Sequence, residues 1–156
     1  MNNEELTEMS KENDIDITDL KALAIDLDEW GIEHDILEIA EEMFINESPD
    51  FVVGKYRYID QDKIDDIMIE KLADDAYGMG CFTAAFLADL TDLPTEMIEV
   101  LQLHEEFEMI GDYILQENLV PKMMEQYSSW DGYGPCFASY DGEELEICNY
   151  YAFKVD

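Results

Sequence analysis

The segment "FVVGKYRYID" (residues 51–60) decides the fold class of this chain. It is rich in β-branched and aromatic residues, a composition typical of a β-strand. Segments with helical spacing lie before and after it. The sequence therefore predicts a small sheet that packs against helices, with strand segments in the middle and at the end of the chain.

Two helices are predicted before this strand. In "TDLKALAIDLDEW" (residues 18–30) one apolar stripe can form a buried face, with Thr18 as N-cap and Gly31 as the end. The stripe consists of Leu20, Leu23, Leu27 and Trp30. A second helix runs from Ile36 to Phe44 and ends before "NESPD" (46–50), because Pro49 cannot continue it.

Several helices and a hairpin are predicted after the strand. Helical spacing recurs in residues 61–75, 81–90, 91–118 (as one helix or two) and 121–130, and we expect "YGMG" (77–80) to break the first two apart. The closing segment "YGPCFASYDGEELEICNYYAFKV" predicts a hairpin that turns at Asp141-Gly142. In that hairpin Tyr140 faces Glu143 and Cys136 faces Ile147.

The predicted fold class is α+β, mostly helical with a small antiparallel sheet that includes a C-terminal β-hairpin. Residues 1–48 are expected to form an acidic helical N-terminal lobe, with "NESPD" as the joint. Residues 51–156 are expected to form an α+β C-terminal domain. One continuous domain is the alternative.

The net charge limits the partners of this chain. Forty Asp and Glu stand against eight Lys and Arg, a formal charge of −32, while 47% of the residues are hydrophobic. That hydrophobic content favours a folded chain over a disordered one. Adaptation to high salt is disfavoured, because Ile (15) outnumbers Ala (10) and Val (5). Such a field repels nucleic acid and anionic lipid and attracts basic partners, so we expect neither direct nucleic-acid binding nor membrane binding.

The cysteines and the N-terminus indicate a cytosolic protein. Three scattered cysteines are expected to be free thiols in a reducing compartment. The start "MNNEELTEMS" has no signal-peptide pattern, and no apolar run approaches the ~20 residues that cross a bilayer.

No motif for catalysis or metal binding is convincing. "DIDITD" (14–19) lacks the Gly and Glu of an EF-hand loop, and "HEEFE" (104–108) lacks the second His of a zinc protease. We expect His104 to be a half-buried structural residue. Glu-x-x-Glu pairs at 38/41, 96/99 and 105/108 could hold Mg²⁺ in a nucleotide hydrolase, but no Lys or Arg cluster is available for phosphates. We therefore predict no enzyme, no catalytic residue, no metal site and no cofactor.

The densest acidic segment is "DLDEWGIEHDILEIAEE" (residues 26–42), with eight carboxylates and no Lys or Arg. Rows of carboxylates on helices resemble the charge of a DNA duplex, which carries one negative charge per ~1.7 Å of axis. The candidate partner-binding residues form a first patch of Asp26, Glu29, Glu33, Asp35, Glu38, Glu41 and Glu42, and a second patch of Asp62, Asp65, Asp66, Asp74 and Asp75. Tyr56, Tyr58 and Trp130 are candidates for an apolar contact edge, although a place in the core is favoured for each.

Three motifs carry a resemblance to a known group of proteins. "YRYID..KIDDI", "GCFTAAFLADLTDLPTEMIEVLQ" and "DGYGPCFASYDGEE" resemble a family of short phage and prophage proteins of uncharacterised function, over roughly residues 51–156. Tyr133, Tyr140, Asp141 and Gly142 match its last motif. The resemblance implies a phage-encoded protein in a host bacterial cytoplasm and supplies no catalytic residue or defined partner. In size and charge the chain also resembles acidic antirestriction and anti-CRISPR proteins.

These features together favour an acidic DNA mimic. Its expected partner is a basic DNA-binding protein or ribonucleoprotein of the host, such as a restriction enzyme or a CRISPR-Cas effector, whose DNA-binding cleft it would occupy. The alternatives are an acidic protein-interaction module without DNA mimicry and the Mg-dependent hydrolase described above. The sequence leaves monomer and homodimer both open.

Overall fold

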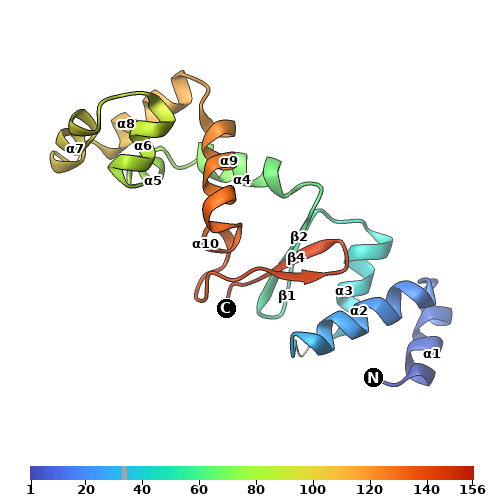
Figure 1. Ribbon diagram of the computed structural model, residues 1–156. Helices are drawn as coiled ribbons and strands as arrows, with labels where there is room; N and C mark the ends of the chain where they lie inside the picture. Colours follow the sequence, from blue (N-terminus) through green and yellow to red (C-terminus); the bar gives the residue numbers. More distant parts are fainter. Residues whose placement is uncertain (33–34) are drawn as a thin grey trace. The chain divides into compact units, whose positions relative to one another are not determined.

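The computed structural model describes residues 1–32 and 35–156, about 60% of which lie in helices. A four-stranded antiparallel sheet, which includes the C-terminal strands, accompanies the helices (Figure 1). The chain is therefore an α+β protein. It forms two compact units, one made of residues 1–64 and 133–156 and one of residues 65–132. We call them unit 1 and unit 2.

Unit 1 contains the sheet, its N-terminal helices and one short helix near the C-terminus. Its elements are α1 (Asn3–Asn13), α2 (Ile17–Glu29), α3 (Ile36–Ala40), the π-helix η1 (Glu41–Ile45), β1 (Asp50–Val53), β2 (Tyr56–Asp60), α10 (Gly134–Phe137), β3 (Leu145–Ile147) and β4 (Tyr150–Lys154). The strand order is β1-β2-β4-β3, so the central pair joins strands far apart in the sequence.

Within the described residues, every regular secondary-structure element of unit 2 is a helix. Its elements are α4 (Ile64–Ala73, which starts at the last residue of the first segment of unit 1), α5 (Ala76–Gly80), α6 (Ala84–Thr91), α7 (Thr95–Leu103), α8 (Phe107–Gln116) and α9 (Val120–Asp131). Residues 91–118 thus form two helices, and α7 follows directly after Pro94, whose fixed φ suits a helix start.

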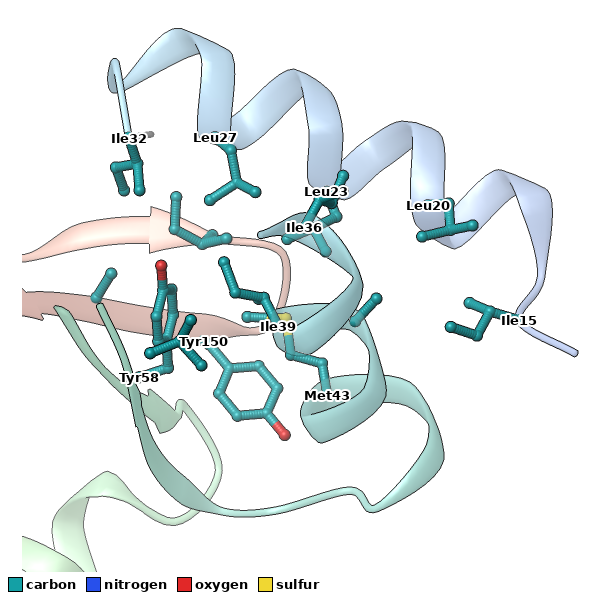
Figure 2. Packing of buried hydrophobic residues seen from close by; sticks show 14 of the residues in the cluster. Ile15, Leu20, Leu23, Leu27, Ile32, Ile36, Ile39, Met43, Tyr58 and Tyr150 are labelled. Carbon is teal, nitrogen blue, oxygen red and sulfur yellow. The ribbon is translucent and has the colours of Figure 1, made fainter. Parts of the chain in front are cut away.

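The N-terminal helices share one core with the sheet. Leu20, Leu23 and Leu27 of α2 are buried, as their spacing predicts, and they point from α2 toward α3 and the strands (Figure 2). Ile39 and Tyr58 are fully buried in the same cluster. The predicted boundary near residue 48 does not match the division into compact units, because residues 1–48 bury their apolar face on strands from the middle and from the C-terminal end of the chain.

Residues 51–60 form a hairpin instead of the single predicted strand. β1 and β2 pair through Val53 and Tyr56, which leaves Gly54 and Lys55 as a two-residue turn. Gly54 has φ +61°, a conformation that glycine adopts without steric cost and that a two-residue hairpin loop requires. Gly54 is a turn signal in the sequence. The turn was not predicted because strand-forming residues on both sides of Gly54 suggest one continuous strand.

The C-terminal hairpin turns at another place than predicted. Ile147 pairs with Tyr150, so the turn consists of Cys148 and Asn149, whereas Asp141-Gly142 lies in the loop before β3. Cys136 lies in α10 and does not face Ile147. In this loop the carbonyl of Gly142 lies so close to Gly134 that a Cβ at position 134 would not fit. All three cysteines are free, as predicted.

Of two further local predictions, one is wrong and one is right only in part. Asp16, not Thr18, caps α2, since its Oδ1 accepts the backbone N–H groups of Thr18 and Asp19. The two helices on either side of "YGMG" are separate, as predicted, but the segment is itself helical: it lies in α5, which Asp75 caps by accepting the N–H of Gly78 at 2.9 Å. Both results follow from the ability of Asp to satisfy the free N–H groups of a helix start.

Candidate interaction surface

Within unit 1, the N-terminal helices carry most of the negative charge. Residues 3–45, which include α1, α2, α3 and η1, hold 15 acidic residues against Lys11 and Lys21, a net charge of −13. The other parts of unit 1 (46–64 and 133–156) hold nine acidic and four basic residues, a net charge of −5. Unit 1 thus has an acidic helical part and a much less acidic sheet part.

Three of the eight basic residues lie together at one end of the sheet. Lys55 is in the β1–β2 turn, and Lys154 pairs in register with Tyr56 beside it. Arg57 binds Asp50 through two hydrogen bonds of 2.8 and 2.6 Å and lies over the ring of Phe137, with its Cζ 5.2 Å from the ring centroid. The Asp50 carboxylate raises the pKa of Arg57, although burial acts in the opposite direction.

The first patch is only partly available to a partner. Glu29, Asp35 and Glu38 are exposed, while Asp26, Glu41 and Glu42 are half-buried. Glu33 lies outside the described residues. The sequence pattern therefore identified a continuous acidic segment, and the fold turns some of its carboxylates inward.

Asp26 has a structural contact inside unit 1. Its Oδ2 accepts the backbone N–H of Cys148 at 2.7 Å and so connects α2 to the β3–β4 turn. Cys148 has φ +54°, an unfavourable conformation for a residue with a side chain. Burial, with help from the Asp26 charge, raises the pKa of Cys148 to about 12.

Asp35 and Glu42 also hold local structure. Asp35 caps α3 by accepting the N–H of Leu37 at 3.1 Å. Glu42 accepts hydrogen bonds from Ser48 Oγ at 2.6 Å and Asn46 Nδ2 at 3.1 Å, which orders the loop after η1. Of the described first-patch residues, Glu29 and Glu38 combine exposure with no such contact in the structure.

Exposed carboxylates of α1 and α2 that were not among the predicted residues add to the charge of unit 1. Glu4, Glu8 and Glu12 lie four residues apart on α1, and Asp28 precedes Glu29 on α2. Residues with this spacing share one helix face, with Cβ atoms ~6 Å apart. The spacing was visible in the sequence, but only the structure shows that α1 and α2 pack together in one unit.

The second patch does not form one cluster. Its five carboxylates are exposed, but Asp62 belongs to unit 1 and the other four belong to unit 2. Within unit 2, Asp65 and Asp66 lie in the first turn of α4, whereas Asp74 and Asp75 follow its last turn. Nine residues of helix separate the two pairs by ~13 Å, so they are separate sites of charge.

Asp62 lines a hollow in unit 1 with a volume of about 360 Å³. Glu47, Asp60 and Asp62 share this hollow with Lys63. At its edge the hydroxyl of Tyr150 donates to the carbonyl of Ser48 at 2.7 Å, and burial together with the nearby carboxylates raises the pKa of this tyrosine to about 12. No group of three or more His, Cys, Asp and Glu side chains within residues 1–32 and 35–156 could hold a metal ion.

The other sequence candidates have mixed outcomes. Tyr58 is fully buried and Tyr56 half-buried, whereas Trp130 is 67% exposed. Trp30, expected in the buried stripe of α2, is exposed, and its Nε1 donates to the carbonyl of Glu146 at 3.2 Å. His104 is exposed at the C-terminus of α7, so the prediction of a half-buried position was wrong.

No protein-family model, curated protein or solved structure matches this chain. No helix in the described part of the chain combines the length and the hydrophobicity needed to span a bilayer.

Proposed function

We propose that this protein is a DNA mimic that binds the basic DNA-binding cleft of another protein and thereby keeps DNA out. The observation that carries the proposal is the 15-to-2 ratio of acidic to basic residues over residues 3–45, the segment that contains α1, α2, α3 and η1. Eight cations can pair one to one with at most eight of the forty carboxylates of the chain, so at least 32 carboxylates have no Lys or Arg of their own to neutralise them.

The energetic basis is the same as for DNA itself. A protein that binds DNA gains free energy because its Lys and Arg side chains release counterions from the phosphates. One row of carboxylates on a helix supplies one charge per ~6 Å, compared with one per ~1.7 Å of duplex. A mimic surface therefore needs several rows, and the exposed rows of α1 and α2 provide them in one compact unit.

The rigidity of unit 1 supports this proposal. The helices that carry the charges are held by buried residues such as Leu23, Ile36 and Ile39 (Figure 2). Carboxylates on a fixed scaffold lose less conformational entropy on binding than those of a flexible acidic tail. We further propose that the target is a host-defence protein, either a restriction enzyme or a CRISPR-Cas effector, and that the two proteins meet in a bacterial cytoplasm.

The experiment that tests the proposal is a competition between the protein and DNA. The protein captures its target at low salt, and the purified complex is then titrated with a 30-base-pair duplex. A mimic is displaced by the duplex, and log Kd rises linearly with log salt concentration. A stable complex of target, duplex and protein together would contradict mimicry.

A charge-reversal pair localises the surface. The triple variant Asp28→Lys, Glu29→Lys, Glu38→Lys should weaken binding by at least tenfold while helix content is unchanged. The matched control reverses three exposed residues of unit 2, Glu117, Glu125 and Asp131, and changes the net charge by the same amount. Equal losses in both variants would show that only the total charge matters.

The second candidate function is an acidic interaction module without DNA mimicry. One observation favours it: unit 2 holds 16 acidic and two basic residues, so strong acidity is not restricted to one face of unit 1. Such a module would bind a basic partner outside the DNA-binding cleft. The complex of target, duplex and protein described above is the outcome that this function requires.

A further inference from the structure

Unit 2 contains an apolar groove that the acidic surface of unit 1 does not explain. It is a hollow of about 180 Å³ between α7 and α8, closed at one end by Thr91 and Leu93. Its walls are formed by Met97, Ile98, Leu101, Met109, Ile110 and Tyr113. Of these, Ile98 and Ile110 are buried, so the hollow reaches the packed interior of the helix pair.

Two of the lining side chains are open to solvent. Met97 of α7 is 49% exposed and Met109 of α8 is 53% exposed. Single exposed apolar side chains are normal, but such side chains grouped around a recess are typical of a contact surface. The two methionines are flexible and can adapt to the shape of an inserted side chain.

The charge around the groove is mostly negative, with Lys122 as the exception, because its Nζ donates to the carbonyl of Leu90 at 3.4 Å, next to the lining residue Thr91. Residues 72–121 contain 11 acidic residues and no Lys or Arg. Exposed acidic residues adjoin the lining residues in the chain: Asp92 lies between two of them, and Glu96, Glu108 and Asp112 each directly precede one. Four exposed carboxylates next to the lining residues thus stand against the single cation of Lys122, so the groove favours a positively charged segment.

The dimensions of the site restrict the occupant. A cavity of ~150 Å³ holds a benzene molecule, so this recess accepts one large side chain such as Phe or Leu. α7 and α8 have 9 and 10 residues, which corresponds to ~14 Å and to two or three turns of a bound helix.

We infer that the α7–α8 groove binds a basic amphipathic helix of a partner protein, with one Phe or Leu side chain in the recess and Lys or Arg side chains above the surrounding carboxylates. Binding of this kind uses apolar anchors at helical spacing for affinity and opposite charges for orientation. The inference concerns unit 2 alone and does not require the DNA mimicry proposed for unit 1.

The test uses a synthetic 18-residue peptide with Leu and one central Phe on one helix face and Lys elsewhere, at 150 mM NaCl. We expect binding by the full chain, with the ¹³C-methyl signals of Met97 and Met109 shifted. A scrambled peptide of the same composition should bind at least tenfold more weakly, and a peptide with Glu in place of Lys should not bind. Equal binding of the scrambled peptide would overturn the inference.

Variants of the lining residues distinguish peptide binding in the groove from non-specific attraction of the peptide to an acidic protein. Met97→Glu combined with Met109→Glu adds two negative charges, so attraction by charge alone predicts tighter binding of the Lys peptide. The groove predicts at least tenfold weaker binding, because the walls of the recess become polar. As a control, Ile25→Glu changes an exposed apolar residue of α2, 65% exposed and outside the groove lining, and should leave the affinity within twofold.

A further control distinguishes this inference from the proposed function. The triple reversal of Asp28, Glu29 and Glu38 should change the affinity for the Lys peptide by less than threefold. A loss of peptide binding in this variant, with binding retained in the methionine variant, would place the peptide on unit 1 and overturn the inference. Failure of the DNA competition would leave the result for the groove unchanged.

Discussion

At the scale of single residues, several of the forty acidic side chains hold local structure. Asp16, Asp35 and Asp75 cap helices, and Glu5 completes a capping box with Asn2 at the start of α1. Each accepts a backbone N–H that would otherwise lack a partner, an interaction typically worth ~1 kcal/mol. Part of the acidity therefore stabilises helix starts and is not evidence for a binding surface.

Asp26 is the acidic residue whose removal should destabilise unit 1 most clearly. Asp26→Ala leaves the N–H of Cys148 without its acceptor in a half-buried turn, which should cost ~1–2 kcal/mol of unfolding free energy. Urea denaturation measures the change. Glu29→Ala in the same helix removes the same charge from an exposed position and should have little effect. Equal destabilisation by both variants would contradict a structural role of the Asp26 contact.

Cys148 should make the stability depend on alkaline pH. Its pKa is raised from 9.0 in the unfolded chain to about 12 in the fold, so the folded state retains the proton more tightly. The contribution to stability is fully present below pH 9 and is lost as pH rises through 12. Cys148→Ala should therefore show a smaller loss of unfolding free energy between pH 8 and 11 than the unchanged protein. Cys81→Ala, at an exposed position, serves as the control and should follow the unchanged protein.

At the scale of elements, unit 2 depends on a close contact between α5 and α8. Gly80 of α5 lies against the carbonyl of Phe107, and Gly111 of α8 lies against the carbonyl of Ala76. At both positions a Cβ would collide with the backbone of the other element. The reciprocal contact explains why these two helices contain glycines where alanine would be the better helix former.

Gly111→Ala should destabilise unit 2 although alanine favours helices. The added Cβ must push α5 and α8 apart, and such overpacking costs ~1–3 kcal/mol, more than the ~1 kcal/mol gained in helix propensity. Thermal unfolding followed by circular dichroism measures the change. Asp112→Ala, the exposed neighbour in α8, is the matched control. A higher melting temperature for Gly111→Ala would show that the two backbones are not in contact.

At the scale of the whole molecule, both units carry a large negative charge. Unit 1 has 24 acidic and six basic residues, and unit 2 has 16 and two, which gives net charges of −18 and −14. Repulsion within each unit opposes folding and is screened by salt over ~10 Å at 0.1 M. The acidity therefore reduces stability at low ionic strength in both units.

Added salt should raise the melting temperature. Between 10 and 300 mM NaCl we expect a rise of ~5 °C, equivalent to ~1–2 kcal/mol for a chain of this length. The triple reversal of Asp28, Glu29 and Glu38 lowers the net negative charge by six and should respond less to salt. A melting temperature independent of NaCl would contradict the repulsion. Addition of glucose at the same osmolality controls for effects other than screening.

Local sequence determined where most helices form, the α+β fold class and the excess of acidic over basic residues. The spacing of Leu20, Leu23 and Leu27 specifies which face of α2 is buried, because that periodicity is a property of the helix itself. Likewise, the strand-forming composition of residues 51–60 and 145–154 indicated a sheet among the helices. These features depend on neighbours within a few residues and can be predicted without knowledge of the fold.

Only the tertiary structure decided how the strands pair and which carboxylates are free. β2 pairs with β4 about 90 residues later in the chain, and this pairing joins both ends of the sequence into unit 1. The acceptor role of Asp26 depends on Cys148, 122 residues away. No local pattern encodes such contacts, since they arise when distant apolar faces are buried together. For the same reason the groove between α7 and α8 became visible only once the two helices were packed.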